Sequence, residues 1–282
     1  MGETWVYNYD NAGNITSRLV CELTPENEEA IDYNGNSYTY SSSEWGDLLV
    51  KFNNSPITYD AIGNPLSYNN GRAYTFTWRG RRMETAQVSG KTMSFTYNDE
   101  GIRTSKTVNG VTTTYYLSGS QIVGEETNGN LTIYLYDSMG MPIGMQYHDA
   151  SYSEGQFDVF WYEKNMQGDI VAVYDEAGNK LVSYVYDAWG DNQGVYYSGG
   201  ASSSHAVAKN PFRYRGYYYD LDLGLYYVNS GYYDAKIISR PIKTALCRVT
   251  KGGNAKNYLL YCLFSRELAR ERELSFCFIE YV

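Results

Sequence analysis

The 282-residue sequence is poor in the residues that mark disulfide-rich proteins and metal-binding proteins. Before residue 247 its only cysteine is Cys21, so the body of the chain has no internal disulfide framework. The other three cysteines are Cys247, Cys262 and Cys277. The two histidines, His148 and His205, have no cysteine or histidine at metal-ligand spacing. Surface or loop positions are therefore expected for both, and neither a metal nor a cofactor is predicted.

Positive charge and long apolar runs are also scarce. The chain has 23 basic and 32 acidic residues, a net charge of −9, whereas a nucleic-acid-binding surface would be basic. No stretch reaches the roughly 18 apolar residues of a membrane span, and Met1 is not followed by a signal peptide. A secreted or cell-surface location would therefore depend on an export signal outside this segment or on a dedicated export machine.

Aromatic residues and glycine are abundant instead. The chain has 32 Tyr, 9 Phe, 5 Trp and 27 Gly, but only 6 Pro. Aromatic and β-branched residues favour strands, whereas Gly, Asn and Asp favour turns. This composition predicts an all-β architecture with many tight turns.

One phrase, Tyr-Asp-x-x-Gly-Asn followed by an apolar residue, recurs along the chain. Clear copies begin at Tyr9, Tyr59 and Tyr174, and looser ones at Tyr97 and Tyr136. A unit of about 20 residues fits one β-hairpin. The Asp opens the turn by accepting backbone N–H groups, the Gly takes a positive φ, and the tyrosines line one face. The predicted signature residues, all with a structural role, are Tyr9, Asp10, Gly13, Tyr59, Asp60, Gly63, Tyr97, Gly101, Tyr136, Asp137, Gly140, Tyr174, Asp175, Gly178, Tyr186, Asp187, Gly190, Tyr219, Asp220, Gly224, Tyr233 and Asp234.

The repeated aspartates have a second interpretation as calcium ligands. A calcium site needs several clustered oxygen ligands, whereas each unit offers one Asp in a turn-forming context. Asp220 and Asp222 make the best local pair, but a polar hairpin tip explains them equally well. Turn structure is therefore the favoured interpretation, and no metal-binding or catalytic residue is predicted.

The densest aromatic block, residues 210–234, reads NPFRYRGYYYD and then GLYYVNSGYYD. Together with the repeated phrases it resembles the YD-repeat, or RHS-repeat, family, and the block itself resembles the RHS repeat-associated core motif. The resemblance divides the chain into repeats (residues 1–209), the core motif (210–234) and an atypical tail (235–282). It implies tandem β-hairpins in a spiralling sheet that forms part of a hollow shell, as in bacterial RHS and toxin-complex proteins and in animal teneurins.

The resemblance also implies a function. The chain would be a structural segment of an exported or cell-surface shell that encapsulates and delivers a C-terminal toxin in competition between bacteria. Its partners would be the upstream repeats of the same shell and the enclosed toxin, without nucleic acid or a membrane span. The chain is therefore predicted not to be an enzyme, with only residues 235–282 left open. A cell-surface adhesion or carbohydrate-binding module, in which tyrosines stack on a ligand, is the alternative.

The tail differs from the rest in charge, cysteine content and pattern. The first 234 residues carry 14 basic and 28 acidic residues, whereas the last 48 carry nine and four. Apolar residues at helical spacing predict a short amphipathic helix within residues 257–273. A residual toxin enzyme, a capping helix and a sequence unrelated to the parent fold, such as a frame-shifted end, remain open. The tail has no Asp, so the self-cleavage that many family members perform is not predicted here.

Overall fold

The computed structural model describes residues 3–24, 27–32, 35–42, 48–229 and 231–237. In these ranges the regular elements are strands and two short 3-10 helices, so the predicted all-β fold is confirmed. The helix predicted within residues 257–273, together with most of the tail, lies outside the described residues. The chain divides into two compact units, whose described parts run from residue 3 to 58 and from residue 59 to 237.

The first unit is a six-stranded antiparallel sheet. Its strands follow the order β1-β2-β4-β5-β6, and β3 pairs with β2. Tyr38, Leu49, Phe52 and Ile57 are buried, and the rings of Tyr38 and Phe52 lie 5.3 Å apart. The strands are β1 (Glu3–Tyr9), β2 (Ile15–Thr24), β3 (Asn27–Asp32), β4 (Asn36–Tyr40), β5 (Leu49–Phe52) and β6 (Ser55–Pro56).

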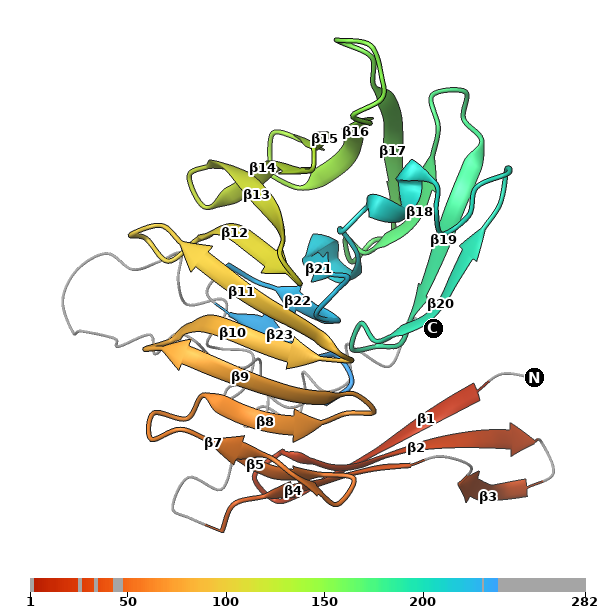
Figure 1. The fold of residues 1–282 in the computed structure, drawn as a ribbon. Coiled ribbons are helices and arrows are strands. Elements are labelled where there is room, and N and C mark those ends of the chain that lie inside the picture. The colour runs from red at the N-terminus through yellow and green to blue at the C-terminus, as the bar shows by residue number, and fades with distance from the viewer. Residues whose placement is uncertain (1–2, 25–26, 33–34, 43–47, 230, 238–282) are drawn as a thin grey trace, which may run out of the picture. The chain divides into compact units, whose positions relative to one another are not determined.

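The second unit contains one open 14-stranded antiparallel sheet in which every strand pairs with its neighbours in sequence, from β7 to β20 (Figure 1). This order is the tandem-hairpin arrangement that the repeated phrase predicts. The strands are β7 (Thr58–Tyr59), β8 (Pro65–Asn69), β9 (Ala73–Arg79), β10 (Arg82–Val88), β11 (Lys91–Tyr97), β12 (Arg103–Val108), β13 (Val111–Ser118), β14 (Gln121–Thr127), β15 (Asn130–Tyr136), β16 (Pro142–His148), β17 (Asp158–Lys164), β18 (Ile170–Tyr174), β19 (Lys180–Tyr186) and β20 (Asn192–Tyr197).

A compact segment, residues 206–237, follows this sheet and is called the core block below. Figure 1 places its short strands, drawn in blue, on the concave side of the sheet. Its three strands form a separate antiparallel sheet in the order β21-β22-β23. The elements are η1 (Ala206–Lys209), η2 (Tyr214–Gly216), β21 (Tyr218–Asp220), β22 (Leu225–Tyr227) and β23 (Tyr232–Tyr233).

Strand β9 illustrates why these sequences form a two-sided sheet. Tyr74 and Phe76 are buried, whereas the alternating residues Thr75 and Thr77 are exposed. Side chains alternate between the faces of a strand, so the aromatic residues of β9 all reach the side that the core block covers. The apolar core of the second unit therefore lies between the sheet and the core block.

Candidate functional site

Each tyrosine–aspartate phrase folds as a turn that its own Asp side chain holds. Asp60 Oδ1 accepts the backbone N–H groups of Ile62 and Asn64 at 3.0 and 2.8 Å. Its Oδ2 accepts the Asn64 side-chain amide at 2.7 Å, and Gly63 takes a φ of +83°. Carboxylate or amide oxygens make turns of the same kind at Asp10, Asn98, Asp137, Asn165, Asp175 and Asp187.

The tyrosines that precede these turns do not all face the core block. Tyr97, Tyr136 and Tyr186 end odd-numbered strands, and all three reach residues of the core block. Tyr174 ends the even-numbered strand β18, and its hydroxyl instead donates to Glu163 on the other face. Turns after odd and even strands lie at opposite edges of a meander. Because the turns have the same handedness, the tyrosine before a turn points to one face at one edge and to the other face at the opposite edge. The expected single face of tyrosines is therefore only partly formed.

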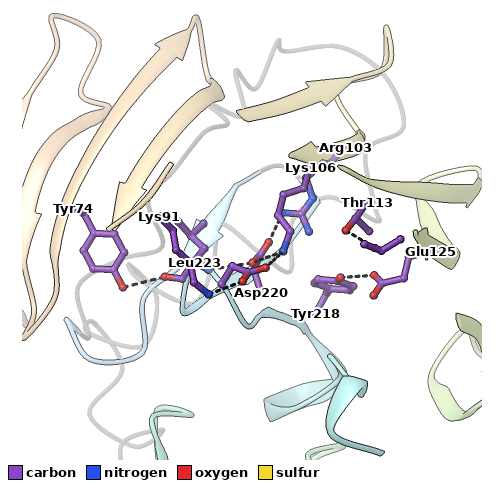
Figure 2. A network of polar contacts seen from close by, with 11 residues as sticks. Tyr74, Lys91, Arg103, Lys106, Thr113, Glu125, Tyr218, Asp220 and Leu223 are labelled. Carbon is purple, nitrogen blue, oxygen red and sulfur yellow. Dashed lines mark hydrogen bonds and ion pairs between the residues drawn. The ribbon is translucent and has the colours of Figure 1, made fainter. Parts of the chain in front are cut away.

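In the core block, the Asp of the phrase bonds to distant strands of the sheet. Asp220 is fully buried, and its two oxygens accept hydrogen bonds from Arg103 Nη1 at 2.8 Å and Lys106 Nζ at 2.9 Å (Figure 2). The second carboxylate, Asp222, accepts from Lys106 at 2.9 Å and from Lys91 at 2.7 Å. These two aspartates are therefore not an exposed polar hairpin tip. Their oxygens bind three cationic side chains of β11 and β12.

The negative charge of Asp220 is stabilised by the cationic side chains around it. Burial on its own would raise the pKa of the Asp220 carboxyl, but the charges of Lys106 and Arg103 outweigh it and hold the pKa well below its ordinary value. The ion pairs between Asp220 and both cations are almost completely shielded from solvent. The carboxylate is therefore ionised at neutral pH and joins the core block to the sheet.

Arg103 is the residue that the sequence interpretation missed. Its side chain has no exposed surface, and its guanidinium carbon lies 4.4 Å from the ring centre of Tyr227 and 4.6 Å from that of Tyr115. Tyr218 and Phe95 lie within 5.7 Å on further sides. An arginine cation is attracted to aromatic faces, and more strongly where water is excluded. No local pattern marks Arg103, because the carboxylate that it binds, Asp220, is 117 residues away in sequence.

Two further polar contacts join the core block to the sheet. Asp234 is buried and accepts hydrogen bonds from the Tyr68 hydroxyl at 2.9 Å and the Asn70 amide at 2.6 Å. Burial raises the pKa of this carboxyl. On β14, the Glu125 carboxylate accepts from the Tyr218 hydroxyl. Strands β12 and β14 therefore hold the core block through charged side chains of their own, whereas at β8 the neutral Tyr68 and Asn70 bond to the carboxylate of Asp234.

The pKa of Glu125 gives a testable pH dependence. Burial raises this pKa, while the hydrogen bond from Tyr218 and the charge of Lys106 partly offset the effect. A raised folded-state pKa means that the stabilisation is present below the ordinary value of 4.5 and is lost as pH rises through the folded-state pKa. The variant Glu125→Gln keeps an acceptor for Tyr218 and carries no charge. In urea titrations, the free energy of unfolding of this variant relative to the wild type should therefore increase as pH rises from about 4 to 7. A difference that does not change with pH would contradict this prediction.

The histidines lie apart from this network. His148 Nδ1 lies 2.8 Å from the carbonyl oxygen of Gln156, and His205 caps η1 by accepting the Val207 N–H. In the part of the chain that the structure describes, no group of three or more His, Cys, Asp or Glu side chains is placed to hold a metal ion. Nor does that part contain a helix long and apolar enough to cross a membrane.

No protein-family model matches the chain, but curated proteins match most of it. The tRNA3(Ser)-specific nuclease WapA of Bacillus spizizenii is 32% identical over 239 residues. The tRNA nuclease WapA of Bacillus subtilis strain 168 is 31% identical over 238 residues. Each match covers 82% of this chain and 9% of the relative, so the chain spans less than a tenth of the length of these relatives.

These names correct one prediction. The resemblance to a structural shell led to the expectation that the protein is not an enzyme, with only residues 235–282 left open. Relatives that match 82% of the chain at 31–32% identity are named as tRNA nucleases, so that expectation is wrong. It rested on the motifs of one short segment, whereas an enzyme's name describes a whole protein.

A solved structure supports the fold. The crystal structure of TcdB2-TccC3-TEV matches with a TM-score of 0.52 and 16% identity, covering 85% of this chain and 14% of that chain. At this identity the likeness concerns the fold alone. The chain therefore shares its fold with part of the TcdB2-TccC3-TEV chain, and its large antiparallel sheet of tandem hairpins is the one that its repeated phrases predict.

Proposed function

We propose that this chain is a wall segment of a β shell in a larger, exported nuclease toxin. Three findings support the proposal. The fold is that of a part of TcdB2-TccC3, the curated relatives are named as tRNA nucleases, and those relatives are about ten times longer than the matched segment. In this proposal, cleavage of tRNA is the activity of the complete protein, and the shell encloses the toxic part until delivery.

The docking of the core block is the single observation that carries the structural part of the proposal. A curved antiparallel sheet leaves a concave aromatic face that must be covered. The core block covers part of that face and joins strands far apart in the sheet: Asp234 contacts β8, Asp220 contacts β12, and Tyr218 contacts β14. We infer that this block closes the inner side of the wall and holds its curvature.

Limited proteolysis of the complete protein tests the proposal. Wild type and the variant Asp220→Ala are treated with proteinase K, and each sample is then assayed for cleavage of total tRNA. The enclosed toxic part should resist digestion in the wild type, and it should become sensitive in the variant because the wall loses its inner support. The exposed-pair variant Glu84→Ala serves as the matched control, since Glu84 and Arg79 pair at the surface. Equal protease sensitivity of Asp220→Ala and the control would contradict an enclosing role.

A further inference from the structure

A polar cavity lies where the core block meets two distant parts of the 14-stranded sheet. Its volume is about 320 Å³, at the lower end of the range for small-molecule sites. Its walls come from the turn between β8 and β9, from the start of β20 and from the core block. Strands β9 and β20 stand eleven places apart in the strand order, and Figure 1 shows them in different parts of the curved sheet. The cavity therefore exists only in the packed second unit.

Arg72, in the turn between β8 and β9, lies against the core block at one wall of this cavity. Gly224 has no side chain, and a Cβ atom added to it would lie 2.5 Å from Arg72 Nη1 and 3.4 Å from the Tyr74 hydroxyl. The missing side chain therefore leaves the guanidinium its place beside the core block. Within the described ranges of the chain, this guanidinium has neither an ion pair nor a hydrogen-bond acceptor. Its donors remain available to a ligand.

Two more unpaired donors line the same cavity. Burial raises the pKa of the Tyr219 hydroxyl and the nearby charge of Arg72 lowers it, so the guanidinium and this hydroxyl are neighbours. The Tyr219 hydroxyl has no hydrogen-bond partner among the described residues, whereas the Tyr74 hydroxyl donates to the Leu223 carbonyl at 3.1 Å (Figure 2). Lys236 lines the cavity near the end of the core block, and in the described part of the chain its ammonium has no ion pair.

Two carboxylates also line the cavity, and both already accept hydrogen bonds. Asp234 accepts from the Tyr68 hydroxyl and the Asn70 amide, and Asp191 Oδ2 lies 3.4 Å from the donor Nε2 of Gln193. These bonds spread the two negative charges over groups of the protein itself. The carboxylates still repel an anionic ligand, so the affinity of the cavity for such a ligand should be no better than millimolar.

We propose that this cavity binds a small-molecule oxyanion, through its phosphate or carboxylate group, between Arg72, Lys236 and the Tyr219 hydroxyl. A guanidinium donates to two oxygens side by side, and an ammonium and a phenol add single donors. The three groups together match the several oxygens of such an anion. The whole chain carries a net charge of −9 and repels anions in general, so binding must come from this local arrangement.

The size and charge of the cavity favour a small ligand over a nucleic-acid strand. A strand binds through many phosphates along a positively charged groove. The residues that line this cavity include as many acidic as basic side chains, Asp191 and Asp234 beside Arg72 and Lys236. Such a lining can hold one anionic group against the two cations, but it does not attract a row of phosphates.

The test titrates the full chain with inorganic phosphate and with citrate at constant ionic strength, and follows backbone amide signals by NMR. At least one of the two probes should bind with millimolar affinity. Binding should shift the amide signals of Gly194 and Gly224, which line the cavity from β20 and from the core block. The amide signal of Gly110, in the distant turn between β12 and β13, should stay in place.

Four variants locate the binding site. Arg72→Gln and Lys236→Gln should each weaken binding about tenfold, because each removes a charged donor. Tyr219→Phe should weaken it several-fold, because it removes one neutral donor and keeps the ring. Arg79→Gln is the matched control and should leave binding unchanged, since Arg79 is 83% exposed and pairs with Glu84. Arg72 and Lys236 are exposed, so their variants should keep the folded sheet.

The two probes separate the possible ligand classes. Binding of phosphate alone supports a phosphate ligand, and binding of citrate alone supports a carboxylate. The proposal is overturned if neither probe shifts the cavity signals of a chain whose circular dichroism shows the folded sheet. It is equally overturned if Arg79→Gln weakens binding as much as Arg72→Gln, because binding would then reflect diffuse surface charge. None of these outcomes depends on the proposed shell function, which the proteolysis experiment tests separately.

Discussion

Replacing Asp220 with alanine is expected to lower the free energy of unfolding by about 3–5 kcal/mol, the usual cost of breaking a buried ion pair from one side. The variant leaves the guanidinium of Arg103 buried without its carboxylate, and the ammonium of Lys106 keeps only Asp222. The aromatic faces around Arg103 do not replace the carboxylate, because these contacts are already present in the wild type. Urea denaturation followed by tryptophan fluorescence at pH 7 measures the difference.

The control for this prediction is the exposed pair on the outer face. Arg79 and Glu84 approach to 2.7 Å, but their side chains are 83% and 44% exposed. Glu84→Ala should therefore change the free energy of unfolding by less than about 1 kcal/mol. If Asp220→Ala costs no more than Glu84→Ala, the buried network does not hold the core block. The double variant Arg103→Met, Asp220→Leu should recover part of the loss, because it removes both buried charges.

The second large effect is expected at Gly190. This glycine has a φ of +88°, and a Cβ atom placed on it would lie 2.4 Å from Cγ of Tyr214 in the core block. Gly190→Ala therefore combines the left-handed backbone penalty of about 1–2 kcal/mol with about 1–3 kcal/mol for overpacking. Tyr214 has little freedom to move away, because its hydroxyl donates to the Ala188 carbonyl at 2.9 Å.

Gly178 offers the matched comparison. It occupies the same position of the repeated phrase with a φ of +81°, but a Cβ atom there would meet nothing within 4 Å. Gly178→Ala should cost only the backbone penalty of about 1–2 kcal/mol. Both free energies come from the same urea titrations. Equal losses at Gly190 and Gly178 would mean that the core block does not press on the turn after β19.

The buried network also explains why the aspartates of the core block could not be interpreted correctly from their surroundings in sequence. Asp60 and Asp220 both follow a tyrosine and precede a glycine by a few residues. Asp60 is partly exposed and bonds to its own turn. Asp220 is buried and bonds to a strand that lies more than 100 residues earlier in the sequence. The same Tyr-Asp pair therefore either holds its own turn or joins the core block to the sheet, and the residues packed against it decide between the two.

Turns, strand alternation and the tandem order of hairpins were readable from the chain because each depends on neighbours within about 20 residues. An Asp that accepts N–H groups two and four residues on, and a Gly at positive φ, act locally wherever they occur. The choice of face for Tyr174, the burial of Arg103 and the exposure of Trp161 depend instead on which edge a turn occupies and on which distant segment covers a face. Those are properties of the packed sheet, since a strand has two faces and its sequence alone does not say what lies against each.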